Sequence, residues 1–201
     1  MKASEIAYEL KTHAPFTSFG AVTGIVIMAL FVQFQVPRGV ADTLFWVFHP
    51  LHVLLSALVT TSMYCIHTKA SIWQVALVGY MGSVGIATLS DSLIPFLGEW
   101  LLDLPNRGVH IGFIEKWWLV NPLAFAGIAL GYFISHTKIA HGGHVLISTW
   151  ASIFHITMAL GTSLDVATAI LIAAFLFLAV WVPCCTSDII FPLLWVKERE
   201  H

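Results

Sequence analysis

The sequence predicts an all-α integral membrane protein of six transmembrane helices, arranged as two inverted three-helix repeats. Three observations support this prediction: charged residues are scarce, six long apolar runs follow one another, and two motifs each occur twice in the same order. Of the 201 residues, 58% are hydrophobic and only 10% are Asp, Glu, Lys or Arg, against about 25% in a soluble domain. A bilayer removes the need for a charged surface, because hydrocarbon surrounds the apolar faces.

The apolar runs hold about 20 residues or more, which is the length that crosses the hydrocarbon core as a helix. They cover residues 17–36, 42–66, 72–97, 117–135, 139–161 and 166–196. We therefore expect a single membrane domain over residues 1–201. It comprises a first three-helix repeat at 17–97, an interfacial connector at 98–116 and a second three-helix repeat at 117–196. The connector mixes charges with Leu and Trp and holds a turn signal at Pro105–Gly108, as interfacial segments do.

The duplicated motifs indicate the repeat. Residues 49–56 read HPLHVLLS and residues 141–148 read HGGHVLIS, whereas residues 90–97 read SDSLIPFL and residues 187–194 read SDIIFPLL. Apolar letters recur easily in such a sequence, but His, Ser, Asp and Pro do not recur in register by chance. Because each repeat has an odd number of spans, the second must lie upside down relative to the first. Transporters built this way bind their substrates near the midplane, where the repeats meet.

Two sets of metal-ligating residues follow from these motifs. His49 and His52 are three residues apart and share one face of a helix. Asp91 lies near the end of the next, antiparallel helix, and so on the same side of the membrane. Two imidazoles and a carboxylate suit Zn²⁺ or Fe²⁺ and leave coordination positions open. The second repeat offers the matching set of His141, His144 and Asp188.

Residues near these two sets could add ligands or orient the histidines. Cys184 and Cys185 shortly precede Asp188, and thiolate ligands would favour zinc or Cu(I) at the second site. Ser56 and Ser148 lie one turn beyond His52 and His144, where a hydroxyl can orient an imidazole.

Other ionisable residues are weaker candidates. We expect His13 to be exposed, and His155 to be either a further ligand or a packing residue in the middle of its helix. A solvated face is expected from the polar residues of the connector, which are Glu99, Asp103, His110 and Glu115.

Ionisable groups inside a bilayer face a cavity or one another, so the sequence predicts a transition-metal-binding membrane protein. The leading hypothesis is a divalent cation (zinc-like) transporter, because inverted halves explain why the ligand set occurs twice, with protons as counter-ions. The alternative is a membrane-embedded metalloenzyme, a hydrolase with a binuclear His/Asp centre. A haem-binding electron carrier with axial His52 and His144 ranks lower, because it gives the paired aspartates no purpose.

The net charge is −2 without a basic tract, so the expected partners are the lipid bilayer and a metal ion, and no nucleic acid. A homo-oligomer is compatible with the sequence. With both termini cytoplasmic, six basic residues lie inside (Lys2, Lys11, Lys69, Lys138, Lys197 and Arg199) and three outside (Arg38, Arg107 and Lys116). This bias favours a multi-pass protein of the cell membrane with both termini in the cytoplasm.

Overall fold

The computed structural model describes residues 3–134, 138–161, 163–186 and 190–195, and all regular structure in these residues is helical. The all-α prediction is therefore confirmed. The long helices are α1 (Ala3–Gln33), α2 (Arg38–His67), α7 (Trp117–Phe133), α8 (Lys138–Ala159) and α9 (Val166–Cys185). Another long helical segment, Ile72–Leu101, consists of α3 (Ile72–Tyr80), η1 (Met81–Gly85), α4 (Ile86–Thr88), η2 (Leu89–Leu93) and α5 (Ile94–Leu101). The described residues also form the short helices α6 (Gly112–Glu115) and α10 (Phe191–Leu194).

Local sequence signals fix several helix ends. Ser71 and Gln74 form a capping box at the start of α3, in which each side chain bonds to the backbone of the other residue. Asp165 caps α9 by accepting hydrogen bonds from the hydroxyl of Thr168 at 2.6 Å and from its backbone N–H at 3.0 Å. These bonds, led by the one from the hydroxyl, lower the pKa of the Asp165 carboxyl.

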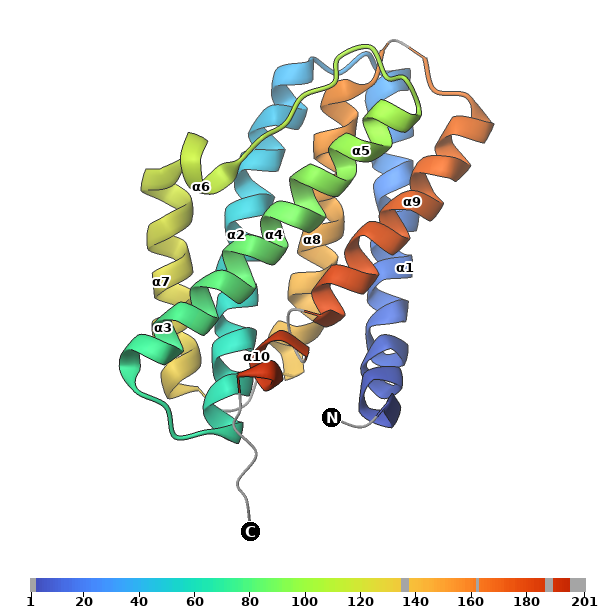
Figure 1. Cartoon of the computed structure of the whole chain (residues 1–201). Coiled ribbons are helices and arrows are strands. Elements are labelled where there is room, and N and C mark those ends of the chain that lie inside the picture. The colour runs from blue at the N-terminus through green and yellow to red at the C-terminus, as the bar shows by residue number, and fades with distance from the viewer. Residues whose placement is uncertain (1–2, 135–137, 162, 187–189, 196–201) are drawn as a thin grey trace.

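The long helices form one bundle in which α2 and α8 lie at the centre and run in opposite directions (Figure 1). On one side, α7 packs against α2 and α3. On the other side, α1 packs against α8 and α9 in the corresponding way. The start of α1 and helix α10 lie at the same end of the bundle, and the segment after α5 crosses the opposite end (Figure 1).

Paired glycines bring the outer helices close to the central ones. Gly20 and Gly24 of α1 contact Thr149 and Ile153 of α8, where an added Cβ would collide with those side chains. Gly127 and Gly131 of α7 would likewise meet the backbone carbonyls of Leu54 and Leu58 in α2. Both pairs have the small-xxx-small spacing that lets membrane helices approach closely.

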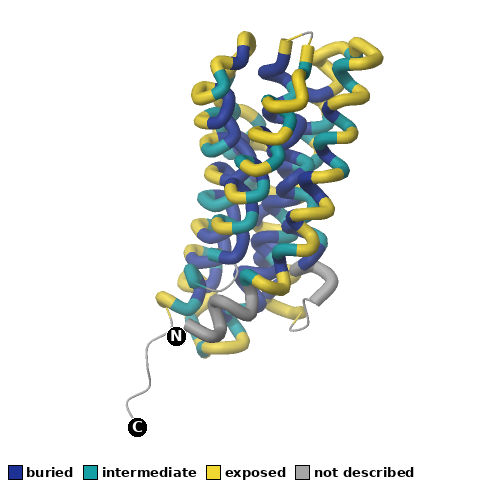
Figure 2. The backbone as a smooth tube through the Cα atoms, turned by 90° about the vertical axis from the view of Figure 1, so that its right-hand side faces the viewer, coloured by how far each residue is buried: buried dark blue, intermediate teal, exposed yellow. Residues whose placement is uncertain are grey.

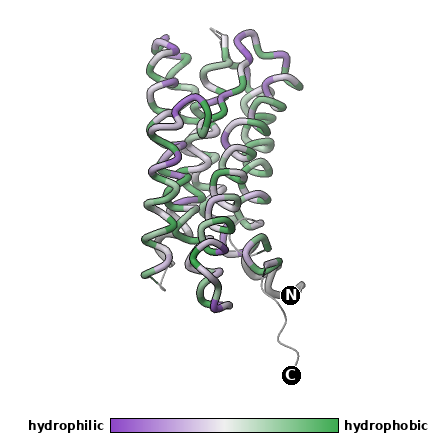
Figure 3. Tube along the Cα trace, turned by 60° about the vertical axis from the view of Figure 1, so that its left-hand side comes forward, coloured by the Kyte–Doolittle hydropathy of each residue, from purple (hydrophilic) through white to green (hydrophobic). Residues whose placement is uncertain are grey.

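The surface of the bundle is mostly apolar. Buried and exposed residues alternate along the outer helices (Figure 2), whereas the described residues of α8 are buried or partly buried, and hydrophobic residues dominate the long helices (Figure 3). Bulky apolar side chains are exposed on the outside, among them Phe19, Val22, Trp73 and Leu178. Within the described residues, four helices are long and apolar enough to cross a membrane, namely Leu10–Gln33, Arg38–His67, Ile72–Leu101 and Val166–Cys185. The six-span inverted arrangement stays a prediction.

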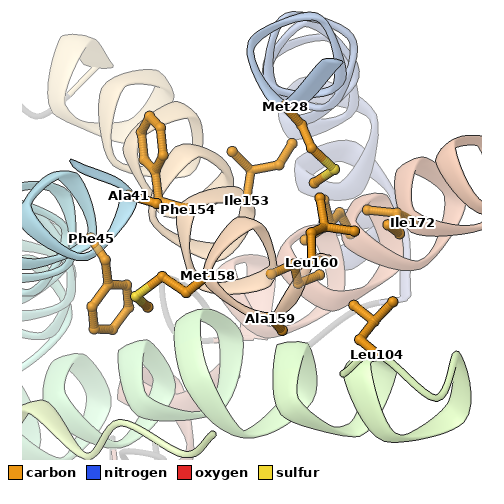
Figure 4. Close-up of a cluster of buried hydrophobic side chains, with 12 residues drawn as sticks. Met28, Ala41, Phe45, Leu104, Ile153, Phe154, Met158, Ala159, Leu160 and Ile172 are labelled. Atoms are coloured by element: carbon orange, nitrogen blue, oxygen red, sulfur yellow. The ribbon is translucent and has the colours of Figure 1, made fainter. Parts of the chain in front are cut away.

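The largest apolar core fills one end of the bundle. Met28 of α1, Phe45 of α2, Phe154 of α8 and Ile172 of α9 belong to it, and Leu104 closes it from the connector (Figure 4). The other half of the bundle interior holds smaller apolar clusters around Val53 and Ala57. The polar site lies between these cores.

A π-helical turn at Leu89–Leu93 places three consecutive polar residues inside the bundle. Ser90, Asp91 and Ser92 are all fully buried. Such π turns are frequent at functional sites.

Candidate metal centre

The structure brings the first predicted set together. The Oδ2 atom of Asp91 lies 2.9 Å from Nδ1 of His49 and 2.8 Å from Nδ1 of His52. All three side chains are at most 1% exposed. The convergence arises because α2 and the Ile72–Leu101 segment are antiparallel, and Asp91 is buried within the π turn of that segment.

Asp91 acts on the two histidines as a hydrogen-bond acceptor. A carboxylate has no proton to donate, so each ring must present Nδ1–H to it. The second oxygen, Oδ1, accepts from the hydroxyls of Ser90 at 2.7 Å and Ser148 at 2.8 Å. Both oxygens are therefore satisfied by the protein. In neutral His52 the free lone pair is then on Nε2, which is the arrangement that carboxylates impose on metal-binding histidines.

His52 meets its counterpart from the second repeat. Its ring stacks on that of His144 with centroids 5.8 Å apart and an interplanar angle of 14°. Its Nε2 atom lies 3.9 Å from the Sγ atom of Cys184. One ligand atom from each of His52, His144 and Cys184 lies within 4.8 Å of the others, and all three residues are buried. We call these three residues the His–His–Cys cluster.

The second predicted set is only partly described. His144 belongs to the His–His–Cys cluster, and Cys185 is buried beside it. The side chain of His141 and the whole of Asp188 lie outside the described residues. Their roles as ligands stay predictions.

His49 occupies a different environment from His52. Its ring stacks on Phe45 at 5.3 Å, and its Nε2 faces Gly112, where an added Cβ would collide with it. Among the described residues, this Nε2 atom has no hydrogen-bond partner. Asp91 therefore holds two histidines that point in different directions, with His52 toward the His–His–Cys cluster and His49 toward the connector.

Two expectations about histidines and acids are corrected by the structure. Glu99 was expected on a solvated face, but it is 1% exposed and its Oε1 lies 2.7 Å from Nδ1 of His155. His13 was expected to be exposed, but it is 2% exposed and its ring packs edge-on against His144 at 6.1 Å. Helix α1 begins before the apolar run, at Ala3, so His13 lies within the helix, and its side chain is buried. Asp103 and Glu115 are exposed as expected.

The burial of these groups limits what the site can do. A polar group in an apolar interior must be hydrogen-bonded, paired or bound to a metal. Two imidazoles and one thiol form a soft ligand set, which suits zinc or Cu(I). Three protein ligands also leave a position for water or another donor in tetrahedral geometry.

No protein-family model, curated protein or solved structure matches this chain.

Proposed function

We propose that this protein is a transition-metal-binding membrane protein that moves a divalent cation, zinc or one like it, across the bilayer. The observation that carries the proposal is the His–His–Cys cluster, whose three ligand atoms lie within 4.8 Å of one another in the buried centre of the bundle. Zinc is bound by these ligand types in proteins.

The position of the cluster supports movement of the ion rather than its permanent storage. His52 comes from the first repeat, whereas His144 and Cys184 come from the second. In transporters with inverted repeats, the site lies where the two repeats meet, and rocking of one against the other opens it to each side in turn. A site shared between the halves could gain or lose ligands during such a motion.

The repeat itself has support beyond the two motifs. The glycine pairs of α1 and α7 occupy corresponding places against α8 and α2, and those central helices are antiparallel. These features agree with six membrane spans in two inverted units and with both termini on one side of the cell membrane.

The alternatives fit the geometry less well. A porphyrin needs room between its axial ligands, but the rings of His52 and His144 are stacked on each other at 5.8 Å. A hydrolase needs access for its substrate. A pocket of about 320 Å³ opens near Arg38, Asn106 and Thr157, and its lining comes from helix ends and the connector rather than from the cluster.

The test is zinc content and zinc movement in one preparation. Wild-type protein purified in detergent should hold about one zinc ion per chain by elemental analysis. The same protein in liposomes should admit external zinc, detected by an indicator dye inside. Cys184→Ser should lower both signals at least tenfold, whereas the matched control Cys65→Ser, at a half-buried position outside the cluster, should not.

The outcomes separate the candidate functions. Zinc that binds but never crosses would favour the metalloenzyme. A strong Soret band in the absorption spectrum would favour haem. Equal zinc content in the wild type and Cys184→Ser would contradict the proposed site.

A further inference from the structure

A second buried acid–base pair lies apart from the His–His–Cys cluster. Nδ1 of His155 and Oε1 of Glu99 are 2.7 Å apart, and each side chain is 1% exposed. Burying ionisable groups in an apolar bundle is costly, and those that persist are generally functional. Glu99 belongs to neither predicted metal set, and His155 was only a weaker candidate for a further ligand, so this pair needs its own explanation.

The surroundings of the pair connect it to one end of the bundle. The backbone N–H of Gly108 donates to Oε2 of Glu99 at 3.2 Å, and the ring of His110 packs against that of His155 at 5.4 Å. His110 is partly exposed, and its Nδ1 lies 3.2 Å from the carboxylate of the more exposed Glu115. These are the titratable groups facing the pair from the connector, which also carries the exposed Asp103–Arg107 ion pair.

Within the part of the chain that the structure describes, the other ring and hydrogen-bond partners of the pair are uncharged. Helix α2 contributes Phe45, whose ring lies edge-on to His155 at 5.3 Å. The π turn contributes Ser92, whose hydroxyl lies 3.4 Å from Nε2 of His155 and accepts from the backbone N–H of His110 at 3.0 Å. Among these neighbours, His110 is the partly exposed titratable group, with 23% of its side chain exposed.

Further buried polar side chains lie on the elements that carry Asp91 and His155. Ser92 is the neighbour of Asp91 in the chain, and both are fully buried. Helix α8 carries Ser148 and Ser152 between His144 and His155, at helical spacing along one face. Ser152 donates to the carbonyl of Ser90 at 2.9 Å, and Ser148 donates to Asp91 itself. Imidazole is the side chain that most often shuttles protons near neutral pH, and His155 carries it here.

The residues Glu99, His155 and Ser92 have no polar counterparts at the matching positions of the other predicted repeat. Alignment of the duplicated motifs places Met63 at the position of His155, Ile189 at that of Ser92 and Val196 at that of Glu99. The histidines and aspartates of the metal sets are duplicated, but the pair and its serine partner are not. A packing feature would be expected in both halves, whereas a group that acts on one side of a membrane would not.

We propose that Glu99 and His155 form a proton-binding site that exchanges protons with water at the connector end and carries them counter to the metal ion. This inference rests on the proposed function, because the metal ion is the partner in the exchange. The proton enters by way of His110 and resides on the Glu99–His155 pair, beside the buried hydroxyl of Ser92. No bond other than those to the moving proton is made or broken.

The test uses full-length protein in liposomes that contain a pH-sensitive dye. External zinc should drive a change in internal pH with the wild type, and equilibrium zinc binding is measured on the same preparation. Glu99→Gln keeps the size and hydrogen-bonding capacity of the side chain, and His155→Gln removes the partner. Each should lower the proton signal at least tenfold while leaving zinc binding within about twofold. Asp103→Asn, on the exposed connector, is the matched control and should retain the wild-type signal.

Each outcome decides the proposal. A wild-type proton signal from Glu99→Gln and His155→Gln would overturn it, as would zinc binding by the wild type with no proton movement. In both cases the proposed metal site would stand. Absence of zinc binding by the wild type would overturn the proposed function, and the coupling with it. Retained zinc binding by the variants shows that they are folded.

Discussion

The imidazole rings of His52 and His144 stack nearly parallel with their centroids 5.8 Å apart, and the two residues lie in different predicted repeats. They occupy corresponding positions in the duplicated motifs HPLHVLLS and HGGHVLIS. The two predicted metal sets therefore meet through their second histidines, and one shared centre replaces two separate ones as the working hypothesis.

A shared centre predicts equal effects of the two histidines. His52→Ala and His144→Ala should each lower zinc affinity by more than about 100-fold, because each removes one of three protein ligands. His67→Ala, at the exposed end of α2, should leave it unchanged. Affinity is measured by equilibrium dialysis, with circular dichroism to check folding. A loss confined to one of the two histidines would show that they do not share an ion.

Asp91 is predicted to act through His52. Asp91→Asn should weaken zinc binding by about 10–100-fold without abolishing it, because the carboxylate orients the imidazole and strengthens it as a ligand. Asp188→Asn should do the same, since Asp188 holds the corresponding place in the sequence. The measurement is a zinc titration with a competing chelator. A complete loss with Asp91→Asn would instead make the carboxylate a direct ligand.

The close contact between α7 and α2 predicts opposite effects of two glycine substitutions. Gly127→Ala should destabilise the protein by about 1–3 kcal/mol, because its Cβ would collide with the carbonyl of Leu54. Gly85→Ala should stabilise it by about 0.5–1 kcal/mol, because the position is open and helical. Thermal unfolding in detergent measures both. Equal shifts in the same direction would contradict the predicted contact.

The inverted arrangement predicts the sidedness of three positions. Tags at the two termini should be accessible from one face of a sealed vesicle, and Asp103→Cys should be labelled by a membrane-impermeant thiol reagent from the other face. Lys2→Cys serves as the control for the terminal side. Labelling of Asp103→Cys and the terminal tags from the same face would exclude an odd number of spans in each repeat.

The sequence predicted the helices well, because an apolar run of spanning length has few alternatives to a helix in lipid. The meeting of His49, His52 and Asp91 also followed from helical spacing and antiparallel order. Contact between His52 and His144 did not, because it depends on how closely α2 approaches α8 across the bundle. Spacing within one helix carries no information about that approach.

The burial of Glu99 and His13 was not predicted from the sequence, because the ends of their helices were placed wrongly. The connector was assigned to the interface from its mixed charges, but α5 continues to Leu101 and keeps Glu99 inside. Helix α1 begins well before its apolar run and continues through Pro15. The paired glycines of α1 and α7 were a usable signal for the outer contacts, since their spacing is visible in the sequence.

The helical segment Ile72–Leu101 has a consequence for how the halves are joined. Near its start, Gly79 lies against Thr61 of α2 and Ile128 of α7, and near its end, Gly98 lies against Phe175 of α9. Each of its two π turns adds about one residue and shifts the phase of the side chains by about 100°. One continuous helical segment of the first predicted repeat thus contacts α2 and α7 near its start and α9 near its end. Removing a single residue from Leu89–Leu93 would rotate the two ends of the segment relative to each other. Its contacts with α2, α7 and α9 could then no longer all form, even with the side chains of the site still present.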